Sequence, residues 1–198
     1  MNLSKTFVTS DTHYGHSKVI KYSNRPFKDV DEMNEVLISN WNSLVSDKDL
    51  IFHLGDFAFG EPGKYLKRLR GKIIFLPGNH DIQLLKNKNL FDRFENAALL
   101  HEASKNINGV RFNLTADIPY DNGNPRGGLI VMNHYANLVW NKSHYGAIHL
   151  HGHSHGTLKY PRVMRAMDVG VDPMNYFPIS LSDVILAMDK IDFSENTV

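Results

Sequence analysis

Aspartate, asparagine and histidine residues gather in five short segments of this chain, and each segment follows an apolar run long enough to form a buried strand. Carboxylate, amide and imidazole groups are the side chains that hold divalent metals when no thiolate is present. The segments are Asp11-Thr12-His13, Gly55-Asp56, Gly78-Asn79-His80-Asp81, Asn133-His134 and Gly152-His153-Ser154-His155. Loops that leave the carboxyl ends of neighbouring strands in an open α/β sheet converge at one edge. The five segments therefore predict one shared metal site.

The segments differ in how strongly each one indicates metal binding. Asp11 and His13 are one residue apart, so an extended backbone would direct both side chains to one ion, but this spacing alone is a weak signal. Gly55-Asp56 is weaker, because such a pair after a strand is usually a turn. The Gly-Asn-His-Asp segment at 78–81 is far more specific, since it joins three ligand types at a glycine that permits a sharp turn. The ordered set of all five is what argues against coincidence.

The composition is that of a soluble globular protein. The 198 residues are 42% hydrophobic and 22% charged, which suffices for a core in one domain over residues 1–198. Cysteine is absent, so the metal ligands must be oxygen and nitrogen. No apolar run approaches the roughly 20 residues that span a bilayer, and we expect a cytoplasmic protein with no membrane partner. The net charge of +1 does not favour a nucleic-acid partner, although it does not exclude one, and the oligomeric state stays open.

The hydrophobic pattern predicts strands and helices that alternate in the first half of the chain. Strands are predicted near 5–10, 49–54, 72–76, 129–132, 147–150, 165–171 and 185–188, with helices near 16–22, 62–69 and 82–88. The clearest helix follows Asp29, because Asp29 and Glu32 have capping-box spacing and apolar residues recur every three or four positions from Val30 to Leu44. Asn108-Gly109 predicts a tight hairpin, and 121–128 a loop.

The ordered motifs Asp-x-His, Gly-Asp, Gly-Asn-His-Asp, His and Gly-His-x-His resemble those of the calcineurin-like metallophosphoesterase superfamily. They extend over about 145 residues, from Asp11 to His155. The resemblance implies an α/β fold, a four-layer αββα sandwich of two mixed β-sheets flanked by helices, with a dinuclear metal centre at the strand ends. The chain is too short for large accessory domains and is most similar to the short single-domain predicted phosphoesterases of bacteria and their phages.

The resemblance implies two metal sites that share one carboxylate. One metal would be held by Asp11, His13, Asp56 and His155. The other would be held by Asp56, Asn79, His134 and His153. Two divalent ions roughly 3.5 to 4 Å apart can generate hydroxide from a bridging water and stabilise an in-line displacement at phosphorus. Mixed nitrogen and oxygen ligation suits Mn, Fe, Zn, Ni or Co, and we expect Mn, largely from the resemblance.

The resemblance also implies three catalytic residues, Asn79, His80 and Asp81. His80 would not bind metal; with Asn79 it would hold the phosphate, and it would protonate the leaving oxygen while Asp81 or Asp11 orients its ring. Histidine changes charge close to neutral pH, which suits proton donation. The alternative interpretation is a histidine that only caps a helix beside Asp81. The prediction is a hydrolase that acts on phosphodiesters first, and on phosphomonoesters or nucleotides second.

Four further residues are candidates for substrate contacts: His16, Arg25, Arg126 and Tyr135. His16 either reaches the substrate or caps the helix that follows it. Arg25 and Arg126 lie in predicted loops and would bind an anion, whereas Tyr135 either walls the site or packs against it. His149 and His151 continue the alternation toward His153, and we interpret them as core residues or as residues that orient the metal ligands.

Two features separate this chain from other functional classes. The second motif of the Ser/Thr protein phosphatases continues as Gly-Asp-x-x-Asp-Arg-Gly, but no arginine follows Asp56 here, where the sequence reads Phe-Ala-Phe-Gly. The basic residues between Lys64 and Lys72 would contact phosphates in a nucleic-acid-binding protein, but we favour a solvated helix face. A non-catalytic metal-binding scaffold of the same fold is the remaining rival. Such proteins usually lose ligands or the catalytic histidine, and this chain retains them.

Overall fold

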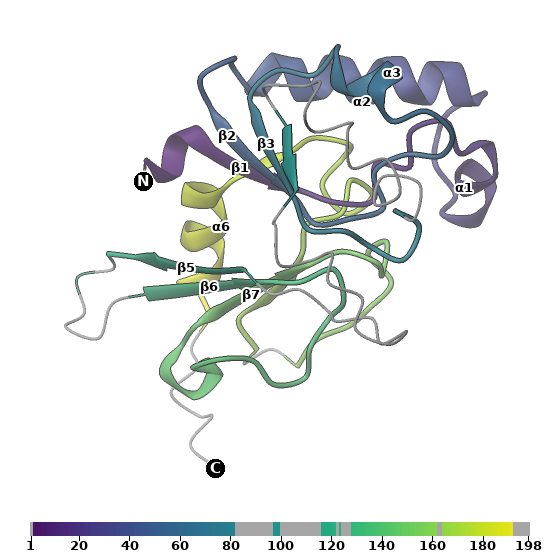
Figure 1. Cartoon of the computed structure of the whole chain (residues 1–198). Helices are drawn as coiled ribbons and strands as arrows, with labels where there is room; N and C mark the ends of the chain where they lie inside the picture. The colour runs from purple at the N-terminus through teal and green to yellow at the C-terminus, as the bar shows by residue number, and fades with distance from the viewer. Residues whose placement is uncertain are drawn as a thin grey trace, which may run out of the picture.

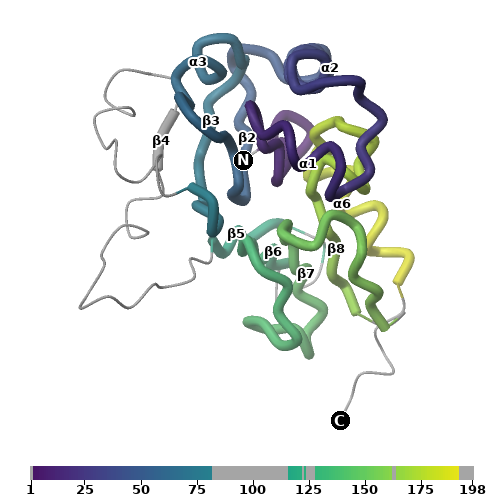
Figure 2. The backbone as a smooth tube through the Cα atoms, turned by 90° about the vertical axis from the view of Figure 1, so that its right-hand side faces the viewer, coloured from purple at the N-terminus to yellow at the C-terminus, as the bar shows by residue number. Residues whose placement is uncertain are grey.

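The computed structural model describes residues 2–81, 97–99, 116–121, 123, 128–161 and 164–191. Two β-sheets lie one above the other, with helices α2 and α3 on the outer side of the first sheet (Figure 1). Figure 2 shows the same two layers after a quarter turn, with β2 and β3 above and β5 to β8 below. This is the α/β sandwich that the motifs predict.

The first sheet has the strand order β4-β3-β2-β1-β9. Its strands are β1 (Thr6–Thr9), β2 (Leu50–His53), β3 (Lys72–Phe75), β4 (Ala97–Leu99) and β9 (Ile179–Ser180). β1 to β4 are parallel, and β9 is antiparallel to β1. Thr9 pairs with His53, and His53 pairs with Phe75, so the three strands end at the same level. The loops that follow them therefore begin side by side.

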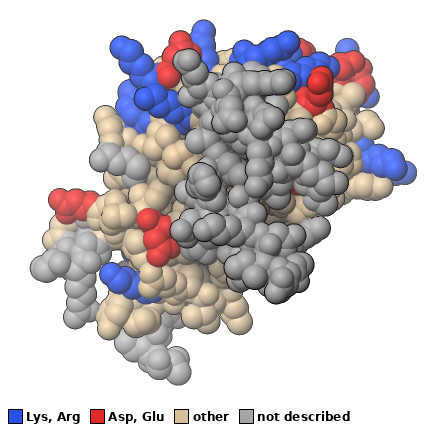
Figure 3. All heavy atoms as spheres, in the orientation of Figure 1, with Lys and Arg blue, Asp and Glu red and all other residues tan. Residues whose placement is uncertain are grey.

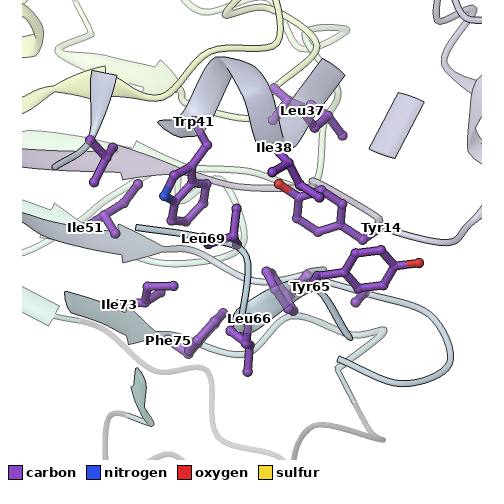
Figure 4. Close-up of a cluster of buried hydrophobic side chains, with 14 of the residues drawn as sticks. Tyr14, Leu37, Ile38, Trp41, Ile51, Tyr65, Leu66, Leu69, Ile73 and Phe75 are labelled. Atoms are coloured by element: carbon purple, nitrogen blue, oxygen red, sulfur yellow. The ribbon is translucent and has the colours of Figure 1, made fainter. Parts of the chain in front are cut away.

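Helices α1 (Ser17–Tyr22), α2 (Val30–Leu44) and α3 (Gly63–Leu66) pack on the face of this sheet opposite the second sheet. The short helix η1 (Leu3–Lys5) precedes β1, and its Leu3 packs against the core between the two sheets. The Asp29 side chain accepts a hydrogen bond from the Glu32 amide (2.8 Å) and caps α2 as predicted. Leu37 and Trp41 of α2 lie over Ile51, Ile73 and Phe75 of the sheet, and all five are buried (Figure 4). The apolar residues that recur along α2 thus form one side of this core.

The second sheet has the order β5-β6-β7-β8. Its strands are β5 (Ala116–Tyr120), β6 (Gly128–Met132), β7 (Ile148–His151) and β8 (Ala166–Asp168), with an antiparallel pair β5/β6 and parallel pairs β6/β7 and β7/β8. Ile148 and Leu150 point to the first sheet and form a second core with Val8 and Phe52. His149 and His151 fall on the opposite face, since side chains alternate along a strand.

The outer face of the second sheet is covered, in the part of the chain that is described, by the segment that contains η3 (Ser143–Tyr145). The Trp140 ring stacks on His149 with 5.2 Å between centroids. The Asn137 amide donates a hydrogen bond to His149 Nε2 (3.0 Å). His149 is therefore a core residue, as expected. Among the described helices, none combines the length and the apolar character needed to cross a membrane.

One predicted strand is wrong. Residues 185–188 belong to helix α6 (Leu181–Met188), which begins at Ser180, whose hydroxyl accepts from the Asp183 amide (3.1 Å). Leu181, Val184 and Met188 are buried at helical spacing against the second core. A four-residue apolar run fits a strand and a buried helix equally well, so the run alone was misleading. The predicted helix at 82–88, the hairpin at Asn108-Gly109 and most of the 121–128 loop lie outside the described residues.

The basic residues near α3 lie on a face where both charge signs alternate. Figure 3 shows Lys and Arg side chains along the side that carries α2 and α3, with Asp and Glu among them. Arg68 donates two hydrogen bonds to Glu35 of α2 (2.7 and 2.6 Å), and both side chains are exposed. The pairing supports a solvated helix face over a phosphate-binding patch.

Trp41→Ala is expected to lower the free energy of unfolding by about 3 to 5 kcal/mol, because it empties a buried volume and removes the hydrogen bond from Trp41 Nε1 to the Arg70 carbonyl (2.9 Å). Leu44→Ala on the same helix is the control, since Leu44 is 45% exposed. Urea unfolding measures both. Equal losses in the two variants would contradict the core assigned to α2.

Candidate metal centre

The loops after β1, β2, β6 and β7 bring two groups of three metal-binding side chains together. Asp11, His13 and His155 form the first group, and Asp56, His134 and His153 form the second. Within each group the ligand atoms lie within 4.8 Å of one another. Asn79, after β3, joins the second group, because its Oδ1 lies 3.0 Å from His134 Nε2. All seven predicted ligand residues thus lie in these two groups or beside them.

Asp56 lies between the two groups. Its Oδ2 is 3.6 Å from His13 Nε2 in the first group and 3.7 Å from His134 Nε2 in the second. Its Oδ1 accepts a hydrogen bond from the His80 amide (2.8 Å), which fixes the orientation of the carboxylate. A carboxylate that bridges two cations requires this position. The bridging role itself stays a prediction.

The backbone of the site is left-handed rather than extended. Five of the seven predicted ligands have positive φ: Asp11 (56°), His13 (49°), Asp56 (57°), His153 (66°) and His155 (48°). Such a conformation costs a non-glycine residue about 1 to 3 kcal/mol. The extended geometry assumed for Asp11 and His13 is therefore wrong. Their side chains converge because each loop curls, and hydrogen bonds from Asp11 N to Gly55 O and from His13 N to Asp56 O (both 3.0 Å) hold the curl.

Glycines let the loops approach one another. A Cβ on Gly78 would lie 2.4 Å from Asp56 Oδ1 and 2.7 Å from His134 Cε1, and a Cβ on Gly152 would lie 2.3 Å from Asp11 Oδ2. These separations are shorter than any van der Waals contact, so larger residues would push the ligands apart. The glycines of the motifs are required by packing at the site.

Polar atoms in the first group lack partners. Asp11 Oδ2 accepts from the His153 amide (2.9 Å), but the buried Asp11 Oδ1 and both ring nitrogens of His13 have no hydrogen-bond partner among the described residues. Burial raises the pKa of Asp11 to about 8 and lowers the pKa of His13. Orphaned buried acceptors are costly. A divalent cation would bind the lone pairs of Asp11 Oδ1 and of one His13 ring nitrogen, so the donor set fits a metal.

In the second group, too, buried acceptor atoms lack a positively charged partner. His134 Nδ1 donates to the Leu54 carbonyl (2.7 Å), which leaves Nε2 as an acceptor in the neutral ring. Burial lowers the pKa of His134 and so favours that neutral ring. Nε2 then faces another acceptor, Asn79 Oδ1, at 3.0 Å. A cation bound by both atoms would relieve this contact.

His80 lies on the open side of the groups. Its side chain is 47% exposed, and its Nε2 lies 4.0 Å from Asp56 Oδ2. Its ring is 5.6 Å from the His13 ring and 5.2 Å from the Phe59 ring, measured between centroids. His80 therefore reaches the centre from solvent, which suits a residue that contacts the substrate.

Asp81 does not take its predicted place beside the His80 ring. It is buried, and its carboxylate accepts hydrogen bonds from the amides of Asp56 (2.7 Å), Phe57 (2.9 Å) and Gly78 (2.8 Å). Asp81 thus fastens the loop after β3 to the loop after β2. Its oxygens face backbone amides because it follows the sharp turn at Gly78, and this turn directs the side chain inward.

Two of the four predicted substrate contacts lie beside the centre. The His16 ring stacks on Phe59 (3.9 Å between centroids) and lies 6.4 Å from the His80 ring. His16 occupies the N-cap position of α1, but its side chain makes no capping hydrogen bond. Tyr135 donates from its hydroxyl to Asn79 Oδ1 (3.4 Å), and its ring is 4.7 Å from that of His153.

The other two candidates are not placed at the substrate. Arg25 is buried and donates to both Asp172 oxygens and to two backbone carbonyls, so it is not available to a phosphate. Arg126 lies outside the described residues. Sequence reasoning missed Asp172, which accepts from His155 Nδ1 (2.7 Å). It follows the apolar run after β8, so the same signal that marked the five segments would have found it.

Comparison with known proteins agrees with this geometry. The sequence model of the calcineurin-like phosphoesterase family matches residues 4–163. The chain belongs to this family. An uncharacterized protein of Methanocaldococcus jannaschii is 30% identical over 96% of this chain and 94% of its own length. The Gene 66 protein of Mycobacterium phage L5 is 25% identical over 86% of this chain and 87% of its own.

A solved structure shares the fold of this calcineurin-like phosphoesterase. It is the crystal structure of a protein of unknown function from Aquifex aeolicus, with a TM-score of 0.62 and 20% identity, and the match covers 92% of this chain and 98% of the other. Membership in the family implies metal-dependent hydrolysis of phosphate esters, and the two ligand groups are consistent with it.

Asp81→Asn is expected to lower the free energy of unfolding by about 1 to 3 kcal/mol, because an amide has one acceptor oxygen for three buried N–H donors. Asp121→Asn is the control, since Asp121 is exposed and, among the described residues, accepts from the Gly123 amide (2.9 Å) in a turn. Denaturant unfolding of the metal-free proteins gives both values. Unchanged stability with a selective loss of activity would restore the ring-orienting role of Asp81.

Proposed function

We propose that this phosphoesterase is a dinuclear metal-dependent phosphodiesterase. The observation that carries the proposal is Asp56, which lies between two ligand groups whose buried acceptors lack positive partners. Asp11, His13, Asp56 and His155 would hold one ion, and Asp56, Asn79, His134 and His153 the other. When bound, a pair of divalent ions supplies Lewis acidity at phosphorus and activates water for in-line attack. Nitrogen-rich mixed ligation favours Mn over Mg.

The side chains around the two ligand groups would bind the phosphate, protonate the leaving oxygen and flank the substrate. Asn79 turns its amide oxygen to His134, and its amide nitrogen is a donor for a phosphate oxygen. His80, whose exposed ring lies beside Asp56, would donate a proton to the leaving oxygen. Tyr135 and His16 flank the substrate on the sides of His153 and His80, respectively.

A phosphodiester fits this arrangement better than a phosphomonoester. A monoester carries up to two negative charges at neutral pH, and phosphatases that bind it usually add an arginine to the metals. Here Arg25 is committed to Asp172 and to backbone carbonyls, and the second motif supplies no arginine. A diester carries one negative charge and needs less compensation. A small molecule or nucleotide with a phosphodiester bond is therefore the proposed substrate.

The first test is hydrolysis. With added Mn²⁺, the metal-stripped chain is expected to cleave bis-p-nitrophenyl phosphate with a higher kcat/KM than p-nitrophenyl phosphate, and EDTA should abolish both activities. A preference for the monoester would replace the diesterase with a phosphomonoesterase or nucleotide phosphatase. No turnover of either compound or of a wider nucleotide panel, despite two bound ions, would leave the non-catalytic scaffold as the function.

The second test separates chemistry from metal binding. His80→Ala should keep two bound Mn²⁺ ions while kcat falls about 10²- to 10⁴-fold on a diester with an alkyl leaving group, the usual range for loss of a general acid. The loss should be smaller with a p-nitrophenyl leaving group, which needs no proton. Asp56→Asn should instead lose metal.

The control for these variants is His144→Ala, which removes an exposed histidine of η3 that belongs to neither ligand group. Its kcat and metal content should match those of the unmodified chain. Full activity of His80→Ala toward the alkyl diester would disprove the proton-donor role.

A further inference from the structure

Arg25 and Asp172 form a buried ion pair that no motif of the sequence predicts. Arg25 Nε donates to Asp172 Oδ1 (2.8 Å) and Nη2 donates to Oδ2 (2.9 Å), and the two side chains are 0% and 8% exposed. The residues are 147 positions apart: Arg25 follows α1, and Asp172 follows β8 of the other sheet. Burial of two charges is costly, and a pair of this kind contributes little net stability. Its position suggests another role.

Arg25 also binds the backbone of the loop after β1. Arg25 Nη2 also donates to the Asp11 carbonyl (2.7 Å), and Nη1 donates to the Thr12 carbonyl (3.1 Å). Asp11 is the residue with φ of 56° in this loop. A guanidinium fork that binds two successive carbonyls holds the left-handed turn in place. The direction of the Asp11 carboxylate follows from that turn.

Asp172 also binds a histidine of the loop after β7. Asp172 Oδ2 accepts a hydrogen bond from His155 Nδ1 (2.7 Å), which leaves Nε2 as the ring atom that faces Asp11 and His13. The His155 ring also stacks on the His13 ring, with 5.3 Å between centroids and 16° between planes. A carboxylate behind a histidine ligand fixes the tautomer and the orientation of the ring.

The Asp56 and His134 side chains of the second group are oriented by other residues, although backbone hydrogen bonds from His153 N to Asp11 Oδ2 (2.9 Å) and from His13 N to Asp56 O (3.0 Å) link the two groups. His134 is oriented by the Leu54 carbonyl, and Asp56 by the amide of His80 and the carboxylate of Asp81. Among the described residues, the side-chain hydrogen bonds of Arg25 and Asp172 reach only the first group and its loop, apart from the bond from Arg25 Nη1 to Met33 Sδ. Ser23 Oγ shares His155 Nδ1 with Asp172. The ion pair therefore touches one of the two groups.

We propose that Arg25 and Asp172 are positioning residues that set the affinity of the metal site formed by Asp11, His13 and His155, and leave the site of Asp56, His134 and His153 unaffected. The inference rests on the proposed dinuclear centre. It assigns the two sites different supports, so a single substitution at a residue outside both ligand groups should weaken one metal site and not the other.

The experiment is a Mn²⁺ titration of the EDTA-stripped full chain, with free and bound Mn²⁺ followed by electron paramagnetic resonance. The variants are Asp172→Asn, whose amide has one acceptor oxygen for Arg25 and His155, and Arg25→Lys, which keeps the charge but loses the fork. In each, one Mn²⁺ should bind about 10- to 100-fold more weakly. The other ion should keep its affinity, and the signal of a magnetically coupled pair should give way to that of isolated Mn²⁺.

Matched controls come from the Arg68–Glu35 pair on the surface, in which the guanidinium also donates to both carboxylate oxygens. Arg68→Lys and Glu35→Gln should keep both Mn²⁺ affinities. Circular dichroism and the Tm of each metal-free variant show whether the fold is retained. If a variant does not fold, Asp172→Glu, which keeps the carboxylate but lengthens its reach, is titrated in its place, with the same selective weakening expected.

The outcomes separate this inference from the proposed function. Equal weakening of both ions, or two unchanged affinities in a folded variant, would overturn the inference and leave the dinuclear centre intact. Selective loss of one ion in a chain that hydrolyses no phosphate ester would support the inference and overturn the proposed function. An unmodified chain that binds no Mn²⁺ would overturn both.

Discussion

The position of the Asp56 carboxylate is the constraint on which the rest of the site depends. One oxygen is held by the amide of His80, and the other faces imidazoles from two different loops, His13 and His134. A buried carboxylate beside imidazole acceptors is unfavourable without a positively charged partner, and cations at the two ligand groups would supply one. The surrounding loops have to hold these groups close together, and they do so through left-handed residues and hydrogen bonds between loops.

The cost of this convergence is local strain, and loop-to-loop hydrogen bonds offset it. Left-handed residues at Asp11 and Asp56 are unfavourable alone. They persist because each loop binds its neighbour: Asp11 N donates to Gly55 O, and the Asp81 carboxylate accepts the amides of Asp56 and Phe57. The strands beneath end at one level, so these short bonds are geometrically available. Strain at the site is thus supported by the register of the sheet.

The two sheets contribute unequally to the two ligand groups, and the ion pair of Arg25 and Asp172 joins them. Asp11 comes from the first sheet and His155 from the second, so their relative position depends on how the sheets are fastened at this end. The apolar contacts between the sheets, such as Val8 and Phe52 with Leu150, set the overall spacing. The hydrogen bonds of Arg25 and Asp172 fix the relative position of Asp11 and His155 more closely than apolar packing does, because apolar contact does not depend on direction.

Helix α2, the first three strands and the residues that gather in the two candidate ligand groups could all be predicted from the sequence, because periodicity, capping and ligand chemistry are local properties. Asp29 caps α2, and β3 has Ile73 and Phe75 in one core and Ile74 partly buried against the other, so both of its faces are covered, as the pattern indicates. The family membership follows from motif order, which is also written in the sequence. The helical nature of Ile185–Met188 was not readable from four apolar residues, because only the surrounding core selects the helix.

Only the tertiary structure decided the direction of each polar side chain. Sequence reasoning placed Arg25 at the substrate and Asp81 beside the His80 ring. The fold turns both inward, where Arg25 meets Asp172 and Asp81 meets three backbone amides. Asp172 was invisible as a partner because it lies 147 residues from Arg25. A hydrogen bond depends on distances and angles of tenths of an ångström and a few degrees. Residue type and spacing along the chain carry no such information.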